Sequence, residues 1–109
     1  VSIIIAYAPC INHGIKMENS QLEMKKAVDS GYWHLYRYNP TLKEQGKNPF
    51  ILDSKEPTLE YEDFLKGETR YKSLIARDPE LAQELFEGAK QNAKDTYEYY
   101  KSLAEKTIF

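Results

Sequence analysis

Cys10 and His13 carry the residue types most suited to chemistry near the start of the chain, and they lie three positions apart. A thiol and an imidazole at this spacing resemble half of a zinc site, but structural zinc needs four ligands. The only other histidine, His34, lies in an aromatic run with no second cysteine. Cys10 therefore has two interpretations, one ligand of a site completed from outside this chain or a small buried hydrophobic residue. His13 more often forms loop hydrogen bonds than binds a metal.

Two other groups of residues suggest chemistry less strongly. The aromatic residues Tyr32, Trp33, Tyr36 and Tyr38 are expected to pack a core or an interface rather than stack on a cofactor, with Arg37 paired to an acidic neighbour or stacked on a ring. Four carboxylates have the spacing of a solvated helix face and no apolar pocket to separate their pKa values, so no acid/base pair is predicted: Glu60, Glu62, Asp63 and Glu68. The chain has no glycine-rich phosphate loop, nucleophile elbow or two-cysteine motif.

The elements that would position Cys10 can be predicted from local patterns. The apolar run 1–7 predicts a buried inner parallel strand that delivers the thiol to its carboxyl end, where open α/β sheets bind ligands. Ser20 to Glu23 matches a capping box and predicts the start of a helix. This helix should have an apolar stripe and end at Gly31 in a left-handed cap; the stripe comprises Leu22, Ala27 and Val28.

Strand and helix signals then alternate. Residues 32–38 and 50–53 predict two short strands joined as a hairpin with a long loop. From Pro57 onward the pattern is helical, weakened at Gly67, and Asp78-Pro79 should begin a long final helix. One stripe of that helix should face the body of the protein: Leu81, Leu85, Ala89, Ala93, Tyr97, Tyr100 and Ala104.

Composition limits the classes of function. The chain has 109 residues and a net charge of −2, which gives no basic surface for nucleic acid. No apolar stretch reaches the ~20 residues that span a bilayer. A single cysteine excludes an internal disulfide and predicts a cytoplasmic protein. Because Val1 already belongs to an apolar run and no initiator Met precedes it, we expect one domain or, more often, a fragment of one, with exposed apolar surface where its neighbours are missing.

Three segments, 4–15, 27–40 and 46–57, closely resemble the carboxyl-terminal end of pyruvate:ferredoxin (flavodoxin) oxidoreductase. The likeness continues through Glu68-Thr69-Arg70-Tyr71 into the final helix. The resemblance implies an α/β fold in which residues 1–109 are the carboxyl-terminal part of the thiamine-diphosphate and proximal-cluster domain. It further implies one buried strand, a helix, a short aromatic strand pair, and two or three helices ending in a long one.

The family oxidises pyruvate with coenzyme A to acetyl-CoA and CO₂. It uses thiamine diphosphate with Mg²⁺ and passes electrons through [4Fe-4S] clusters to ferredoxin or flavodoxin. The resemblance implies that Cys10 is the fourth thiolate of the cluster nearest the thiamine, with Pro9 and His13 beside it. The other three ligands lie upstream in the family, and no catalytic or thiamine-binding residue matches here. The resemblance also implies a fragment inactive alone, the rest of the polypeptide as its partner, and a homodimeric full-length enzyme.

Two alternatives stay open on the sequence. The enzyme could act on another 2-oxoacid, because no substrate contact can be named in this chain. The chain could instead be a small stand-alone interaction module, in which the aromatic strand and long helix bind a partner protein and Cys10 is a buried structural residue. An open reading frame with further cysteines upstream would favour the enzyme.

Overall fold

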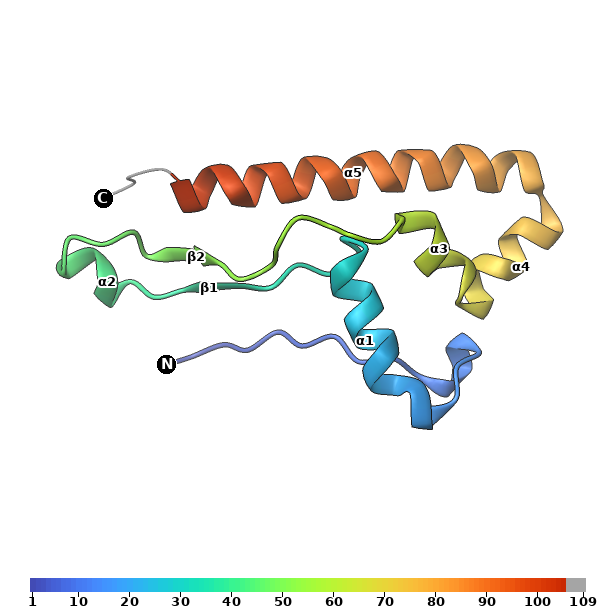
Figure 1. The fold of residues 1–109 in the computed structure, drawn as a ribbon, viewed down its shortest axis with the longest axis horizontal. Coiled ribbons are helices and arrows are strands. Elements are labelled where there is room, and N and C mark those ends of the chain that lie inside the picture. The colour runs from blue at the N-terminus through green and yellow to red at the C-terminus, as the bar shows by residue number, and fades with distance from the viewer. Residues whose placement is uncertain (106–109) are drawn as a thin grey trace.

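Short helices and one strand pair lie along a long carboxyl-terminal helix, and the molecule measures 52 × 30 × 24 Å (Figure 1). The structure is a computed structural model and describes residues 1–105. The elements follow the order 3₁₀ helices η1 (Ile11–His13) and η2 (Met17–Asn19), helix α1 (Ser20–Asp29), strand β1 (Tyr36–Tyr38), α2 (Thr41–Glu44), β2 (Phe50–Leu52), α3 (Tyr61–Lys66), α4 (Thr69–Arg77) and α5 (Pro79–Glu105). The expected α/β class, with several helices ending in a long one, is confirmed.

Helix α5 spans 27 residues, about 40 Å at 1.5 Å per residue. It begins as predicted, because an Asp78 carboxylate oxygen accepts a hydrogen bond from the Leu81 backbone N–H at 3.1 Å. The predicted stripe is wrong over the first two turns: Leu81 and Leu85 are 42% and 49% exposed, whereas the next residue in each case is buried. Tyr97 is buried, and the stripe is correct from Ala89 onward. In the first two turns the buried stripe is therefore shifted by one residue from the predicted stripe, which corresponds to a rotation of about 100° around the helix.

The hydrophobic core lies between α1, α3 and the first turns of α5. Its buried members are Ala27, Phe64, Leu65, Ala82 and Phe86. Helix α1 begins at Ser20 with Asn19 as its N-cap, and Asn19 makes no side-chain capping bond. The last residue of α1 is Asp29, and Gly31 follows shortly after in the predicted left-handed conformation, with φ 83°. Of the predicted α1 stripe, Ala27 is buried but Leu22 is 59% exposed.

The predicted hairpin is confirmed, although β1 and β2 contain only three residues each. They pair antiparallel with Tyr36 opposite Leu52 and Tyr38 opposite Phe50. Their loop holds α2, which was not predicted. The Asn48 amide donates to the Leu103 and Ala104 carbonyls at 2.9 Å each, so it joins the loop to the last turn of α5.

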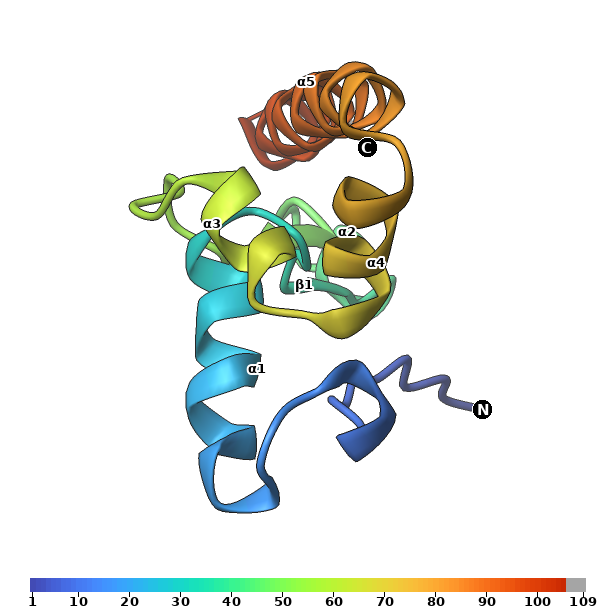
Figure 2. The ribbon, with the colours of Figure 1, turned by 90° about the vertical axis from the view of Figure 1, so that its right-hand side faces the viewer.

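The expectation of a buried strand over residues 1–7 is wrong for this structure. Residues 1–10 form no strand, and Val1, Ile3, Ile4 and Ile5 are all more than 70% exposed. Figures 1 and 2 place this segment on the side of the molecule opposite α5. The physical reason is that a strand needs backbone partners, and the sheet formed by the described residues contains only β1 and β2. Near the end of the segment, Tyr7 packs against the core and bonds to Glu68.

Candidate functional site

Cys10 lies at the end of the N-terminal segment with its thiol exposed. Its backbone is extended, with φ −133° and ψ 147°, and it is the N-cap residue of η1 without a side-chain capping bond. The turn closes at Gly14, which has φ 79° and donates its N–H to the Ile11 carbonyl at 3.0 Å. The interpretation of Cys10 as a buried hydrophobic residue is therefore wrong, and with it the buried structural cysteine of the interaction-module alternative.

Within residues 1–105, no three His, Cys, Asp or Glu side chains gather in a group that could hold a metal ion. The His13 side chain lies outside the described part of the structure. His34 packs against Tyr97 and Tyr100, with ring centroids 6.1 and 5.7 Å apart, and burial lowers its pKa. The described residues thus offer one exposed thiol and no further metal ligands gathered around it.

Glu68 is the polar residue whose environment differs most from the sequence-based expectation. Three of the four carboxylates predicted to line a solvated face do so at least partly: Glu60 pairs with Lys90 at 3.2 Å, Glu62 lies 4.0 Å from Lys66, and Asp63 is exposed. Glu68 is instead completely buried. A buried carboxylate needs a charged partner and hydrogen bonds, because leaving water is costly for an ion.

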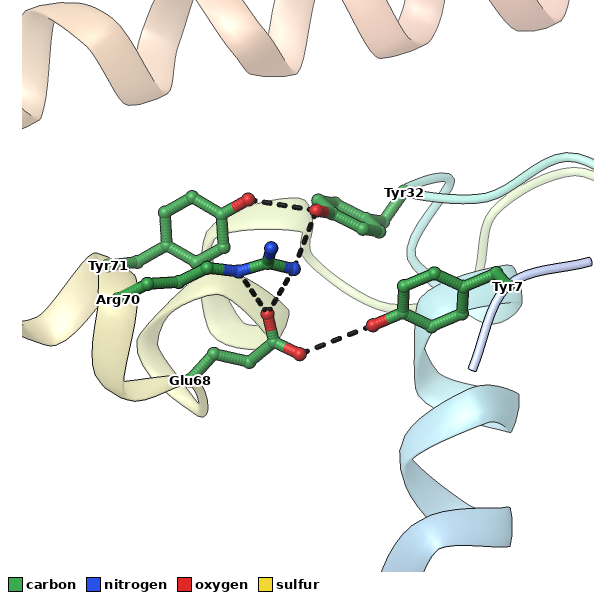
Figure 3. A network of polar contacts seen from close by, with 5 residues as sticks. All are labelled: Tyr7, Tyr32, Glu68, Arg70 and Tyr71. Atoms are coloured by element: carbon green, nitrogen blue, oxygen red, sulfur yellow. Dashed lines mark hydrogen bonds and ion pairs between the residues drawn. The ribbon is translucent and has the colours of Figure 1, made fainter. Parts of the chain in front are cut away.

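Those partners form what we call the Glu68 cluster: Tyr7, Tyr32, Glu68, Arg70 and Tyr71 (Figure 3). Arg70 donates from Nε and Nη2 to Glu68 Oε1, at 3.0 and 2.8 Å. The second oxygen, Oε2, accepts from the Tyr7 hydroxyl at 3.3 Å. Arg70 Nη2 also donates to the Tyr32 hydroxyl at 2.9 Å, and that hydroxyl lies 2.8 Å from the Tyr71 hydroxyl.

The environment of the cluster raises the pKa of two of its tyrosines, Tyr7 and Tyr71. Burial, with the nearby Glu68 charge as the second cause, raises the pKa of Tyr7 to about 12. Burial and the hydrogen bond with Tyr32 raise the pKa of Tyr71 as well. Both hydroxyls therefore stay protonated at neutral pH, which lets Tyr7 donate to the Glu68 carboxylate.

Sequence reasoning missed this cluster, although one local signal was present. Glu68 and Arg70 are two residues apart, directly after the break at Gly67, where the chain turns from α3 into α4. Of the four aromatic residues expected to pack, Tyr32, Trp33 and Tyr36 lie against other rings, whereas Tyr38 is 60% exposed. Tyr36 stacks on Phe50 at 5.4 Å and contacts Tyr100 at 4.9 Å between ring centroids. Arg37 pairs with Asp53 at 2.9 Å, as predicted. These rings form a second group in addition to the Glu68 cluster, and we call it the hairpin cluster: His34, Tyr36, Phe50, Tyr97 and Tyr100.

Comparison with known proteins gives the following results. No family model matches the chain. The chain is 62% identical over 95% of its length to the pyruvate:ferredoxin oxidoreductase of Moorella thermoacetica and 54% identical over 94% to the pyruvate-flavodoxin oxidoreductase of Enterobacter agglomerans, covering 9% of each relative. It is also 40% identical over 95% of its length to the pyruvate dehydrogenase [NADP(+)] of Cryptosporidium parvum, covering 6% of that protein.

The similarity extends over almost the whole chain but over less than a tenth of each relative. No helix within residues 1–105 combines the length and apolar composition needed to span a bilayer. The chain is thus related to one segment of the pyruvate:ferredoxin and pyruvate-flavodoxin oxidoreductases.

Proposed function

We propose that this chain is the carboxyl-terminal part of the thiamine-diphosphate and iron–sulfur domain of a pyruvate oxidoreductase, and that Cys10 supplies one thiolate to a [4Fe-4S] cluster. The observation that carries the proposal is the 62% identity over 95% of the chain to a pyruvate:ferredoxin oxidoreductase. The relatives cited above all have pyruvate in their names, which favours pyruvate over another 2-oxoacid.

Cys10 has the properties that such a ligand needs. Each iron of a [4Fe-4S] cluster takes one thiolate, so a cluster requires four cysteines. Cys10 is the only cysteine of this chain and its thiol is exposed, so it is available to a cluster whose other ligands lie outside these residues. The cluster would carry electrons between the reacting pyruvate and an external acceptor. This chain's part in that task is to hold one sulfur in place.

The remaining parts of the proposal follow from the likeness to the family. The complete enzyme would use coenzyme A, thiamine diphosphate and Mg²⁺ and reduce ferredoxin or flavodoxin as a cytoplasmic homodimer. Residues 1–109 would belong to its thiamine-diphosphate-binding fold but contribute no thiamine or pyruvate contact that we can name. We therefore expect the chain to be inactive without the rest of the enzyme.

The test is Cys10→Ala in the complete protein that carries this segment. An alanine has no atom that can bind iron, so the variant should lose about four iron atoms per chain, the content of one cluster. Iron and acid-labile sulfide are measured together with ferredoxin reduction. Asn12→Ala, an exposed position in the same turn, is the matched control and should leave both unchanged. Normal iron content and normal acceptor reduction in Cys10→Ala would contradict the proposal.

A further inference from the structure

The turn that carries Cys10 is attached on both sides to one short stretch of the chain. Tyr7, three residues before the cysteine, bonds to Glu68. Gly14, four residues after it, lies against Thr69. Two attachments that flank a loop fix its position far better than one, because a single attachment leaves the loop free to pivot. Glu68 and Thr69 are adjacent at the start of α4, so one element holds both sides.

The attachment before Cys10 combines a hydrogen bond with ring packing. The Tyr7 hydroxyl donates to Glu68 Oε2 at 3.3 Å. Its ring lies 5.6 Å from Trp33 and 5.9 Å from Tyr32 between centroids, the latter edge to face. Residues 1–6 before it are exposed, so Tyr7 is the first residue of the N-terminal segment to enter the folded body. Figure 3 shows its hydroxyl directed at the carboxylate.

The attachment after Cys10 depends on the absence of a side chain. Gly14 has φ 79°, a left-handed conformation that residues with a Cβ rarely adopt. A Cβ at this position would overlap the Thr69 hydroxyl oxygen. The backbone of the turn therefore approaches the first residue of α4 as closely as only glycine permits.

Glu68 is a firm anchor for the turn. Its side chain is completely buried, and Arg70 bonds to Oε1 twice, which leaves Oε2 directed at Tyr7. Its backbone carbonyl accepts the Tyr71 and Lys72 N–H groups at 3.1 and 3.0 Å, so the first turn of α4 fixes its main chain. Hydrogen bonds to a charged group are roughly twice as strong as neutral ones.

We propose that Glu68 and Arg70 are positioning residues for Cys10: Arg70 holds the Glu68 carboxylate, and the bond from Tyr7 to this carboxylate keeps the turn that carries Cys10 at a fixed place. The inference rests on the proposed role of Cys10 as a cluster ligand. Residues behind a metal's ligands orient them and tune the metal, and the reduction potential of an iron–sulfur cluster responds to local charge, hydrogen bonds and solvent access. Weakening these bonds should therefore leave the iron–sulfur cluster in place but change its spectrum and its reduction potential.

The first measurement is peptide-resolved hydrogen exchange of the complete protein. Tyr7→Phe removes the hydroxyl and keeps the ring, and Glu68→Gln keeps an acceptor but removes the charge. In Tyr7→Phe the Gly14 amide, which donates to the Ile11 carbonyl, should exchange about tenfold faster, the factor that corresponds to losing one hydrogen bond to a charged group. Glu68→Gln should have a smaller effect in the same direction, because a neutral acceptor remains. Tyr38→Phe, at a tyrosine 60% exposed in the hairpin, is the control. Exchange in Tyr7→Phe no faster than in the control overturns the proposal, whether or not Glu68→Gln folds.

The second measurement separates positioning from a merely structural role. In Tyr7→Phe the reduced cluster should give a shifted or broadened electron paramagnetic resonance signal and a changed reduction potential, with full iron content. Faster exchange with an unchanged signal and potential overturns the positioning role. The proposed function is tested independently by Cys10→Ala: if that variant keeps all its iron, Cys10 is not a ligand, whatever the exchange of the turn shows.

Discussion

The Glu68 cluster and the hairpin cluster contact α5 at opposite ends, through Tyr71 to Phe86 in one and Tyr36 to Tyr100 in the other. The Glu68 cluster contains an arginine–carboxylate pair, Arg70 with Glu68, and the hairpin cluster lies near another, Arg37 with Asp53. In the Glu68 cluster the carboxylate is completely buried, whereas in the hairpin the Arg37 and Asp53 side chains are 67% and 33% exposed. The same chemical pair therefore has two roles: one pair fixes the geometry of buried groups, and the other lies on the surface in contact with water.

The difference follows from desolvation. A buried carboxylate loses its hydration and needs bonds of defined direction, so Tyr7 and Arg70 must stay where they are. The hairpin cluster consists of rings, whose packing is less directional, and water continues to solvate the neighbouring Arg37–Asp53 pair. The Glu68 cluster thus joins residues far apart in the chain by directional bonds, whereas the hairpin cluster packs rings against α5.

The comparison predicts its largest effect for Arg70→Ala. Removing one partner of a buried pair costs about 3 to 5 kcal/mol, because the other charge is left behind. Arg70 is 40% exposed and water can partly replace it, so we expect a loss of about 2 to 3 kcal/mol in the free energy of unfolding. Denaturant unfolding followed by the fluorescence of Trp33, the only tryptophan, measures this change.

Arg70→Lys is the matched control for this prediction. It keeps the positive charge but loses the planar group that bonds Glu68 and Tyr32 together, so it should recover part of the loss. Equal stability of wild type and Arg70→Ala would show that the carboxylate does not depend on its partner, and the distinction between the two clusters would fail.

A smaller effect is expected from His34 in the hairpin cluster. Burial lowers its pKa from the ordinary value of 6.5. The unfolded chain then binds the proton more readily than the folded protein, so the free energy of unfolding falls as the pH decreases through 6.5 toward the folded pKa. His34 is only half-buried, which keeps the effect below that of Arg70→Ala.

The measurement compares unfolding of the wild type and His34→Gln at pH values above and below 6.5. Other groups also titrate in this range, so only the difference between the two proteins reports on His34. The wild type should lose more stability on acidification than the variant. An identical pH dependence in both would mean that the imidazole is solvated when folded.

The features that the sequence predicted correctly depend on residues close together in the chain. Asp78-Pro79 begins α5, Gly31 lies just after α1 and Gly67 separates α3 from α4, and each follows from the backbone preferences of a few neighbouring residues. The hairpin was predicted for the same reason, although its strands are shorter than expected.

The errors involve partners that local patterns do not contain. The burial of Glu68 depends in part on Tyr7, which is 61 residues away. Leu81 and Ala82 both fit an apolar stripe, so the sequence pattern does not determine which of them faces the core. That depends on the orientation in which α5 follows α4. A strand over residues 1–7 requires neighbouring strands, which no pattern within the run can supply. The exposure of Cys10 follows from that same missing sheet.

The smallest effect is expected at Arg37, the counterpart of Arg70 in the hairpin. Arg37→Ala removes a pair with good geometry, bonded through Nε and Nη2 to both Asp53 oxygens. Both groups stay in contact with water when the pair is broken, so water replaces the lost bonds and side-chain entropy is regained. The unfolding midpoint should not change beyond experimental error, measured under the same conditions as Arg70→Ala. A loss as large as that of Arg70→Ala would mean that burial does not distinguish the two pairs, and that bidentate geometry decides their contribution instead.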